Sequence, residues 1–330
     1  MARVLYAHSR KATFIEVDRA LLAERWEVID FYQPGRVTNL ARLLPSLLRA
    51  DAVVGWWASW HTFWPITLAW LLRKPALLIV GGFDVASLPE VDYGFQRPGL
   101  RRWLSRWVIR RASRLMTNSF HSQREIEANI GIGPERVAVV HHGVPDPFGA
   151  LPAGERAAVA LSVGYVTRDN LEVKGQRAFV EAAALLPEVS FVLAGPLDDD
   201  PAVAALRVAA APNVTFAGPA FGEPLLDLFR RASVYVQPSL SESFGIAVAE
   251  AMLAGCIPAV TDSGALPEVV GDVGVRIAAS DAASIAAAVR AALELGPAER
   301  RRARERVLRE FPIDMRRRGL GEQVERLLGG

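Results

Sequence analysis

The sequence predicts an α/β protein built from two doubly wound parallel-sheet domains. Short apolar runs rich in valine, leucine and isoleucine alternate with amphipathic helical patterns along the chain, which indicates parallel strands joined by crossover helices. A chain of 330 residues normally divides into two domains. A segment rich in proline and glycine, from Pro145 to Gly154, separates the two halves. We therefore expect one domain over residues 1–150 and a second domain from residue 151 onward.

In the first half, short apolar runs predict the strands. They are Val4–Ala7, Trp26–Phe31, Ala52–Trp56, Ala76–Val80, Arg114–Thr117 and Val137–His141. Apolar residues that recur every three or four positions predict the helices between them. They are Phe14–Glu24, Leu40–Leu48, Pro65–Leu72, Leu100–Arg111 and Ser119–Asn129.

The second half repeats this pattern. Its predicted strands are Val159–Val163, Ser190–Ala194, Val214–Ala217, Val234–Gln237 and Ile257–Thr261. Its predicted helices are Gln176–Leu186, Ala202–Ala210, Pro224–Ala232, Gly245–Ala254, Ala282–Leu295 and Met315–Leu328. In sheets of this kind, ligands bind beyond the carboxyl ends of the strands, and candidate site residues are sought there.

One segment, Val53–Leu72, has no charged residue and is long enough to span a membrane. However, polar residues and Pro65 lie near its middle, and its five tryptophans are spread along it instead of gathering at the ends. We therefore predict a strand, a loop at Trp57–Phe63 and a helix, and treat a membrane span as the alternative.

Composition excludes several classes of protein. A hydrophobic content of 51% supports sizeable cores, and a net charge of +2 does not favour binding to nucleic acid. The only cysteine, Cys256, lies in an apolar run and is expected to be a buried, unreactive thiol. One cysteine cannot form a disulfide framework, and the start of the chain has no secretory apolar region, so we expect a cytoplasmic protein.

The most informative segment runs from Ser241 to Met252 and reads S-E-S-F-G-I-A-V-A-E-A-M. It leads from the predicted strand Val234–Gln237 into a helix and places Glu242 and Glu250 eight positions apart. The first N–H groups of a helix have no partner and attract phosphate. If the segment is mostly helical, eight residues rise about 12 Å, similar to a nucleotide diphosphate sugar from ribose to sugar ring. One carboxylate could then hold the ribose and the other the sugar.

This segment resembles the E-x7-E signature of the retaining glycosyltransferases of family 4, which have the GT-B fold. The resemblance continues through Ala254–Val260 and Gly264–Val270, which match a small-residue turn, a strand and a Gly-x-x-x-E loop. The alternative, an ordinary amphipathic helix with glutamates at both ends, does not account for these flanking segments. The resemblance implies two Rossmann-like domains that face each other across a cleft. The acceptor side would be 1–150, the donor side 151–312, and a last helix at about 313–330 would pack back on the first domain.

The resemblance also implies a role for each residue of the signature. Glu250 would hold the ribose hydroxyls of a nucleotide diphosphate sugar, and Glu242 would bind the sugar and stabilise an oxocarbenium-like transition state. The diphosphate would lie on the backbone amides of Ser243, Phe244, Gly245 and Ile246. The sugar would pass to an acceptor hydroxyl with retention, and neither a metal nor a cofactor would be needed.

A second candidate region is the loop from Gly164 to Gly175, which follows a predicted strand and contains Arg168 and Lys174. It resembles the first loop of the donor domain in the family, where basic residues neutralise the departing diphosphate. Lysine is rare here, at three against 35 arginines, which favours a need for a compact charge at Lys174. A chance surface lysine is the alternative. The arginine usual in the family after the glycine is Tyr165 here, and we assign its role to Arg168 instead.

In the first half, His61 follows the third strand, near the position where the family often places a histidine that contacts the sugar or acceptor. We therefore take His61 as a candidate catalytic residue, with a hydrogen-bonded core histidine as the alternative. Gly82 and Asp84 follow the next strand and resemble the Gly-x-Asp-Val loop of the family, which predicts a place at the cleft. Ordinary turn glycines would look the same.

Two further patterns could indicate metal. The run Asp198-Asp199-Asp200 contains the D-x-D pattern that binds metal in the other glycosyltransferase fold, but we expect a solvated surface loop there. The adjacent histidines His141 and His142 have no further ligand at a suitable spacing. No metal site is predicted.

Residues 100–115 give the main indication of the class of acceptor. An apolar helical face with Leu100, Trp103 and Trp107 opposes an arginine-rich face, which suits the surface of a membrane. The alternative is a helix whose apolar face packs on the core. A membrane contact would favour a lipid-linked glycan as acceptor, a soluble glycan being the other possibility, and would place the protein at the inner face of the membrane.

Other functions remain open at this point. A sugar-nucleotide epimerase or a glycosyl phosphorylase would keep the fold, although a phosphorylase needs a lysine for pyridoxal phosphate and only three are present. A peripheral membrane protein that binds a nucleotide sugar without catalysis would not need both glutamates.

Overall fold

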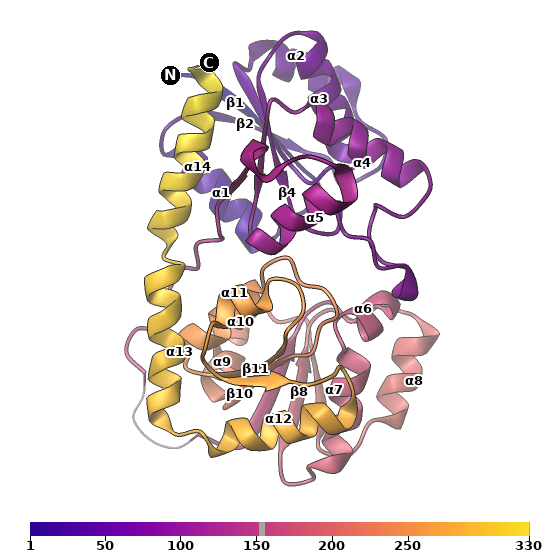
Figure 1. Ribbon diagram of the computed structural model, residues 1–330, viewed down its shortest axis with the longest axis vertical. Helices are drawn as coiled ribbons and strands as arrows, with labels where there is room; N and C mark the ends of the chain where they lie inside the picture. The colour runs from indigo at the N-terminus through magenta and orange to yellow at the C-terminus, as the bar shows by residue number, and fades with distance from the viewer. Residues whose placement is uncertain (152–155, 330) are drawn as a thin grey trace. The chain divides into compact units, whose positions relative to one another are not determined.

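A computed structural model describes residues 1–151 and 156–329. The chain divides into two compact units (Figure 1). The N-terminal unit comprises Met1–Gly143 together with Ile313–Gly330, and the C-terminal unit comprises Val144–Pro312.

The N-terminal unit is built on a sheet of six parallel strands in the order β2-β1-β3-β4-β5-β6. Its strands are β1 (Arg3–His8), β2 (Glu27–Tyr32), β3 (Ala52–Trp56), β4 (Ala76–Val80), β5 (Arg114–Thr117) and β6 (Val137–Val139). Its helices are α1 (Thr13–Ala23), α2 (Leu40–Arg49), α3 (Trp60–Leu71), α4 (Leu100–Arg111), α5 (Phe120–Ile130) and α14 (Ile313–Leu328), with 3-10 turns η1 (Pro89–Val91) and η2 (Pro134–Arg136). The winding direction reverses between β1 and β3, which marks their carboxyl ends as the expected ligand position.

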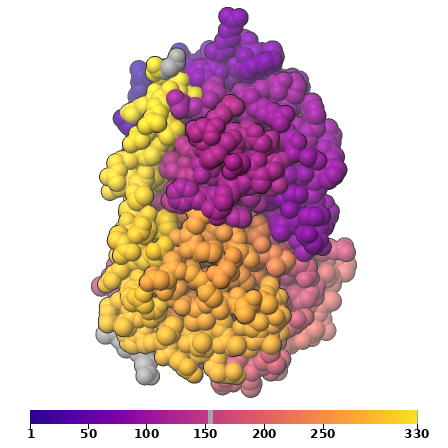
Figure 2. Space-filling model, in the orientation of Figure 1, coloured from indigo at the N-terminus to yellow at the C-terminus, as the bar shows by residue number. Residues whose placement is uncertain are grey.

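Helices cover both faces of this sheet. Alternate strand residues form one core with α2, α3, α4 and α5, and the residues between them form a second core with α1 and α14. The last helix of the chain therefore completes the N-terminal unit, against which it lies in yellow in Figure 2.

A buried ion pair fixes α14 to this unit. The guanidinium of Arg316 donates from Nε to Oδ1 of Asp18 at 2.8 Å and from a terminal nitrogen to Oδ2 at 2.6 Å. Arg316 also donates to Asn118 and to the carbonyl of Val140. Both charged side chains are almost fully buried. Pairing and hydrogen bonding offset the cost of removing these charges from water.

The C-terminal unit has a second sheet of six parallel strands, in the order β12-β11-β10-β7-β8-β9. Its strands are β7 (Val159–Val163), β8 (Ser190–Ala194), β9 (Val214–Gly218), β10 (Val234–Gln237), β11 (Ile257–Thr261) and β12 (Val275–Ile277). Its helices are α6 (Arg168–Val173), α7 (Gln176–Ala182), α8 (Pro201–Ala209), α9 (Glu223–Arg231), α10 (Ile246–Leu253), α11 (Leu266–Val270), α12 (Ala282–Glu294) and α13 (Pro297–Glu310), with a 3-10 turn η3 (Ala183–Leu185). This is the strand order of dinucleotide-binding domains, with the reversal between β7 and β10.

The cores of this unit again lie on both faces of the sheet. One contains residues of α6, α7, α8 and α12, and the other contains residues of α9, α10, α11 and α13. Cys256 lies in the second core, where its thiol donates to the carbonyl of Phe229 at 3.1 Å and burial raises its pKa to about 12. The expectation of a buried thiol is therefore confirmed, and its raised pKa disfavours the reactive thiolate form.

The two parallel sheets confirm the predicted α/β, doubly wound fold class. The predicted loop at Trp57–Phe63 is wrong, because α3 already begins at Trp60. The hydroxyl of Thr62 accepts a hydrogen bond from the backbone N–H of Ser59 at 3.1 Å, which stabilises the start of the helix ahead of Pro65. Among the described residues, no helix is long and apolar enough to cross a membrane.

Candidate functional site

The carboxyl ends of β7 and β10 bring together Lys174 and Glu242. The ammonium of Lys174 lies 2.8 Å from Oε2 of Glu242 and donates to the carbonyl of Ser241 at 3.0 Å. Both side chains are largely buried, at 22% and 17% exposed. Residues 68 positions apart in the sequence thus form one charged pair at the edge of the sheet.

Two glycines let the loops of this site approach each other. Gly264 has φ +64°, and a Cβ there would lie 2.2 Å from the carbonyl oxygen of Glu242. The neighbouring Ala265 donates its N–H to that same oxygen at 2.8 Å. Gly175 also has φ +64°, and a Cβ there would lie 2.4 Å from the carbonyl oxygen of Pro238. Glycine is therefore required at both positions for Lys174 and Glu242 to meet.

The helix that follows Glu242 begins later than expected. Gly245, with φ +98°, is the residue before α10, which runs from Ile246. The assumption of a mostly helical segment between the two glutamates is therefore wrong. Ser243 and Gly245 lie in the turn, and only the second half of the segment is helical. The first amides of α10 have no partner within the helix, and they follow directly on the turn that begins at Glu242.

Phe244 has a different environment from its neighbours. Its side chain is buried and packs edge-on against Phe311, with ring centroids 5.2 Å apart. The ring thus anchors the turn in the core, and only the backbone of Phe244 is left for contact with a ligand.

Glu250 lies one turn into α10 and is partly buried. Within the described part of the chain its carboxylate has no hydrogen-bond or ion-pair partner. Burial raises its pKa from 4.5 to about 7. A carboxyl group in this state is typical of a ligand-binding position, because a purely structural acid is normally paired when buried.

The candidate residues in the loop after β7 lie in different environments. Gly164 follows β7 directly. Gly195 packs closely against it, because a Cβ on Gly195 would lie 1.9 Å from the carbonyl oxygen of Gly164. The carbonyl of Tyr165 accepts hydrogen bonds from the side chains of Asn170 and Gln176. Arg168 begins α6 and is exposed to solvent. The role of Arg168 stays a prediction.

A buried hydrogen-bond network under the site was not predicted. The amide of Gln237 donates to the hydroxyl of Ser239 at 2.6 Å, and the hydroxyl of Thr261 donates to the carbonyl of Ser239 at 2.6 Å. The hydroxyl of Ser280 donates to the carbonyl of Pro238 at 2.6 Å. The network fixes the loop that leads to Glu242. Its signal in the sequence was the polar residues at the ends of two buried strands.

In the N-terminal unit, His61 is buried within α3. Its Nε2 donates to the carbonyl of Trp56 at 2.6 Å, and its ring meets Trp57 edge-on. Burial lowers its pKa to about 4, so the ring is neutral at pH 7. This geometry holds the turn after β3. The catalytic role of His61 stays a prediction.

Asp84 holds the same turn from the neighbouring strand. Its carboxylate accepts hydrogen bonds from the N–H groups of Ala58 at 2.8 Å and Gly81 at 3.1 Å. Burial raises its pKa to about 6. Two residues of this region have a positive φ, Gly82 at +106° and Trp57 at +61°. The ring of Trp57 lies where a Cβ of Gly81 would be. Asp84 therefore stabilises a strained turn at the carboxyl end of β3.

The helix at residues 100–111 divides its apolar side chains between two environments. Leu104 and Val108 are buried in the core, whereas Leu100 and Trp103 are 62% and 51% exposed. Arg106 donates to Gln96, and Arg110 donates to the carbonyl of Ile130. One side of this helix therefore packs on the core, as the alternative interpretation expected, and another side presents an exposed apolar edge.

The run Asp198-Asp199-Asp200 precedes α8. The carboxylate of Asp200 accepts the N–H of Ala202 at 2.7 Å and so caps the helix. Among the described residues, no group of three histidine, cysteine or acidic side chains is arranged to hold a metal ion.

The chain matches two models of protein families. Residues 4–146 match the family described as Glycosyltransferase Family 4, and residues 160–295 match the family described as Glycosyl transferases group 1. A protein from Mycobacterium sp. (strain KMS) named D-inositol 3-phosphate glycosyltransferase is 28% identical over 314 residues, which cover 86% of this chain and 70% of the relative. A protein of the same name from Streptomyces scabiei is 30% identical and covers 66% of this chain and 53% of the relative.

Solved structures resemble the chain over its whole length. A sucrose-phosphate synthase from Thermosynechococcus elongatus gives a TM-score of 0.78 at 18% identity, with 100% of both chains covered. Anabaena HepE in complex with UDP-glucose gives 0.77 at 17% identity, with 99% of this chain and 100% of that chain covered.

Two Rossmann-like parallel-sheet domains and these structural neighbours give the protein the GT-B fold of glycosyltransferases. The chain belongs to glycosyltransferase family 4.

Proposed function

We propose that the protein is a retaining glycosyltransferase that moves a sugar from a nucleotide diphosphate sugar to an acceptor hydroxyl without a metal. One observation carries the proposal. Glu242, which pairs with Lys174, lies four residues before α10, and Glu250, whose carboxyl has no partner among the described residues, lies one turn into that helix. Complexes of HepE with UDP and with UDP-glucose support a donor of this class.

Lys174 and the first amides of α10 would hold the diphosphate. The amides carry partial positive charge at the start of a helix, and the lysine adds a full charge. The negative charge on the diphosphate grows as the bond to the sugar breaks, so both groups would stabilise the transition state more than the bound donor. Lys174 would then exchange its contact with Glu242 for one with the phosphate.

Glu250 would hold the ribose hydroxyls. Its pKa of about 7 leaves a mixture of protonated and ionised forms at neutral pH. The ionised form accepts hydrogen bonds from two hydroxyl groups, so donor affinity is expected to increase as the pH rises through 7.

Glu242 would bind the sugar hydroxyls and stabilise positive charge on the sugar ring. Attack from the same face, with the leaving phosphate taking the proton of the acceptor, needs no base from the protein. This agrees with the environment of His61, whose Nε2 is already hydrogen bonded and whose pKa of about 4 makes it a weak base.

The acceptor is proposed as a hydroxyl of a glycan or a lipid-linked glycan. The relatives named D-inositol 3-phosphate glycosyltransferase add a phosphorylated inositol to the acceptors to be tried.

The test begins with a thermal-shift screen of UDP-, GDP- and ADP-sugars, since a ligand that binds the folded state raises the melting temperature. Transfer is then measured with the preferred donor, and NMR of the anomeric proton of the product reports retention or inversion. Glu242→Gln should abolish transfer, whereas Glu188→Gln, an exposed glutamate of the same unit, should not. Unchanged transfer in Glu242→Gln, or an inverted product, would refute the proposed mechanism. Conversion of the donor to another sugar nucleotide without acceptor would instead indicate an epimerase.

A further inference from the structure

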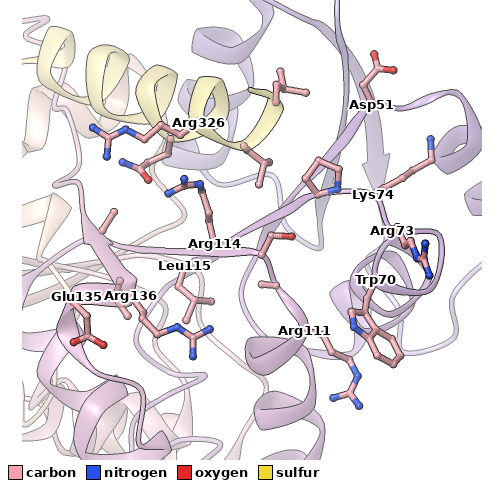
Figure 3. Close-up of a pocket in the computed structure, with 18 residues that line it drawn as sticks. Asp51, Trp70, Arg73, Lys74, Arg111, Arg114, Leu115, Glu135, Arg136 and Arg326 are labelled. Carbon is pink, nitrogen blue, oxygen red and sulfur yellow. The ribbon is translucent and has the colours of Figure 1, made fainter. Parts of the chain in front are cut away.

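A large pocket of about 1110 Å³ opens at the amino edge of the N-terminal sheet, where β3, β4, β5 and β6 begin. Residues just before or at the start of these strands line it, together with the ends of α3, α4 and α14 (Figure 3). The carboxyl ends of the same strands, with His61 and Asp84, lie at the opposite edge of the sheet. The pocket is therefore separate from the candidate acceptor side of this unit.

Positive charge dominates the lining. Six basic side chains oppose two acidic ones, Asp51 and Glu135. The basic residues are Arg73, Lys74, Arg111, Arg114, Arg136 and Arg326. Asp51 is already engaged, because its carboxylate accepts the backbone N–H of Arg3 at 2.7 Å. The pocket thus keeps a clear excess of positive charge.

Three of these arginines have no counter-charge among the residues that the structure describes. Within the described part of the chain, the guanidinium groups of Arg73, Arg114 and Arg136 make no hydrogen bond and no ion pair. Arg114 is partly buried, and Figure 3 shows its side chain directed toward Arg326 of α14, with Arg136 below it. Repulsion between grouped cations costs free energy, and a bound anion removes that cost.

Arg111 is held in place by aromatic rings. Its guanidinium carbon lies 3.0 Å from the ring centroid of Trp107 and 4.8 Å from that of Trp70. Its Nε is buried and has no hydrogen-bond partner in the described ranges 1–151 and 156–329. Rings on the guanidinium fix its orientation without neutralising its charge, which prepares it for an anionic ligand.

Trp70 forms an apolar part of the pocket rim, and Leu71 and Leu72 follow it in the chain. Trp70, Leu71 and Leu72, at the end of α3, are between 44% and 61% exposed. Tryptophan and leucine beside arginines are the side chains that settle at a lipid–water interface.

We propose that this pocket binds phosphate groups, carried either by a soluble phosphorylated compound or by the headgroup of an anionic phospholipid. The planar guanidinium groups of Arg114 and Arg136 match the oxygens of phosphate in a two-pronged geometry. The volume accommodates a ligand larger than one phosphate, and the apolar rim places lipid chains beside the headgroup if the source is a bilayer. The proposal goes beyond sugar transfer and does not depend on it.

The test uses the full chain with two kinds of probe. Inorganic phosphate and pyrophosphate, titrated at constant ionic strength, test the soluble source. Sedimentation with phosphatidylcholine vesicles that contain or lack phosphatidylglycerol tests the lipid source. Arg114→Gln and Arg136→Gln should each weaken binding by about fivefold, the change expected for one lost charge contact. Arg290→Gln, an exposed arginine of α12, is the matched control and should bind as the unaltered protein does.

The two sources give different results. Saturable binding of phosphate or pyrophosphate that both pocket variants weaken supports a soluble ligand. Vesicle binding that requires phosphatidylglycerol, and that Trp70→Ala also weakens, supports the headgroup. The proposal is overturned if neither probe binds, or if Arg290→Gln lowers binding as much as the pocket variants do. Arg136 is exposed, so Arg136→Gln decides the result if Arg114→Gln fails to fold.

Discussion

The ion pair between Arg316 and Asp18 should dominate the stability of the N-terminal unit. Arg316→Ala leaves a buried carboxylate without its partner, because both side chains are almost fully buried and the guanidinium makes four hydrogen bonds. Breaking a buried pair from one side costs about 3–5 kcal/mol. For a unit of this size, the melting temperature should fall by about 6–20 °C.

The sequence supplies a probe for this unit alone. All eight tryptophans lie between Trp26 and Trp107, inside the N-terminal unit. Tryptophan fluorescence during urea unfolding therefore follows this unit and is silent on the other, which avoids treating a two-domain protein as a single transition.

A matched variant and a double-mutant cycle complete the experiment. Arg318→Ala removes an exposed arginine two positions along α14 and should change the free energy of unfolding by less than about 0.5 kcal/mol. The double variant Asp18→Ala/Arg316→Ala should be less destabilised than the sum of the single variants, since neither charge is then buried alone. Equal stabilities of Arg316→Ala and Arg318→Ala would show that the buried ion pair contributes little.

Three further predictions concern the C-terminal unit. Burial raises the pKa of Glu250 from 4.5 to about 7, so the folded protein resists ionisation of this group and its stability should decline as the pH rises from 4.5 to 7. In Glu250→Gln, the melting temperature measured by calorimetry should no longer show this decline. An unchanged pH profile in the variant would contradict the raised pKa of Glu250. Gly264→Ala should abolish transfer, because its Cβ would displace the backbone of Glu242, while Gly296→Ala, whose Cβ meets no atom within 4 Å, should not; equal activities would show that the close approach is unimportant. Lys174→Ala should weaken donor binding by about tenfold, the loss of one charged hydrogen bond, and calorimetric titration that finds unchanged affinity would remove Lys174 from the phosphate site.

Most strands and helices could be predicted from local patterns in the sequence. The strand at Ala52–Trp56 and the helix at Leu100–Arg111 have the predicted bounds, because apolar runs and helical spacing directly report burial against a sheet. The error at Trp60 has a different cause. Pro65 was interpreted as a helix start, whereas the contact between Ser59 and Thr62 stabilises a start five residues earlier, at Trp60. The short helices α6 and α11 were missed because five or six residues are too few to show a period.

The candidate site was predicted in part. Lys174 and Glu242 were each identified from a local motif, but the sequence contains no sign that they form a pair 2.8 Å apart. That contact depends on the strand order, which brings the loops after β7 and β10 together. The basic pocket at the other edge of the N-terminal sheet was missed for the same reason, because its arginines come from segments far apart in the chain.

The position of α14 has a consequence for synthesis on the ribosome. One face of the first sheet must wait for a helix that is translated only after residues 144–312. Until then Asp18 has no guanidinium beside it, and the apolar residues that later contact α14 are open to solvent or to chaperones. The first unit to be translated is therefore expected to mature last.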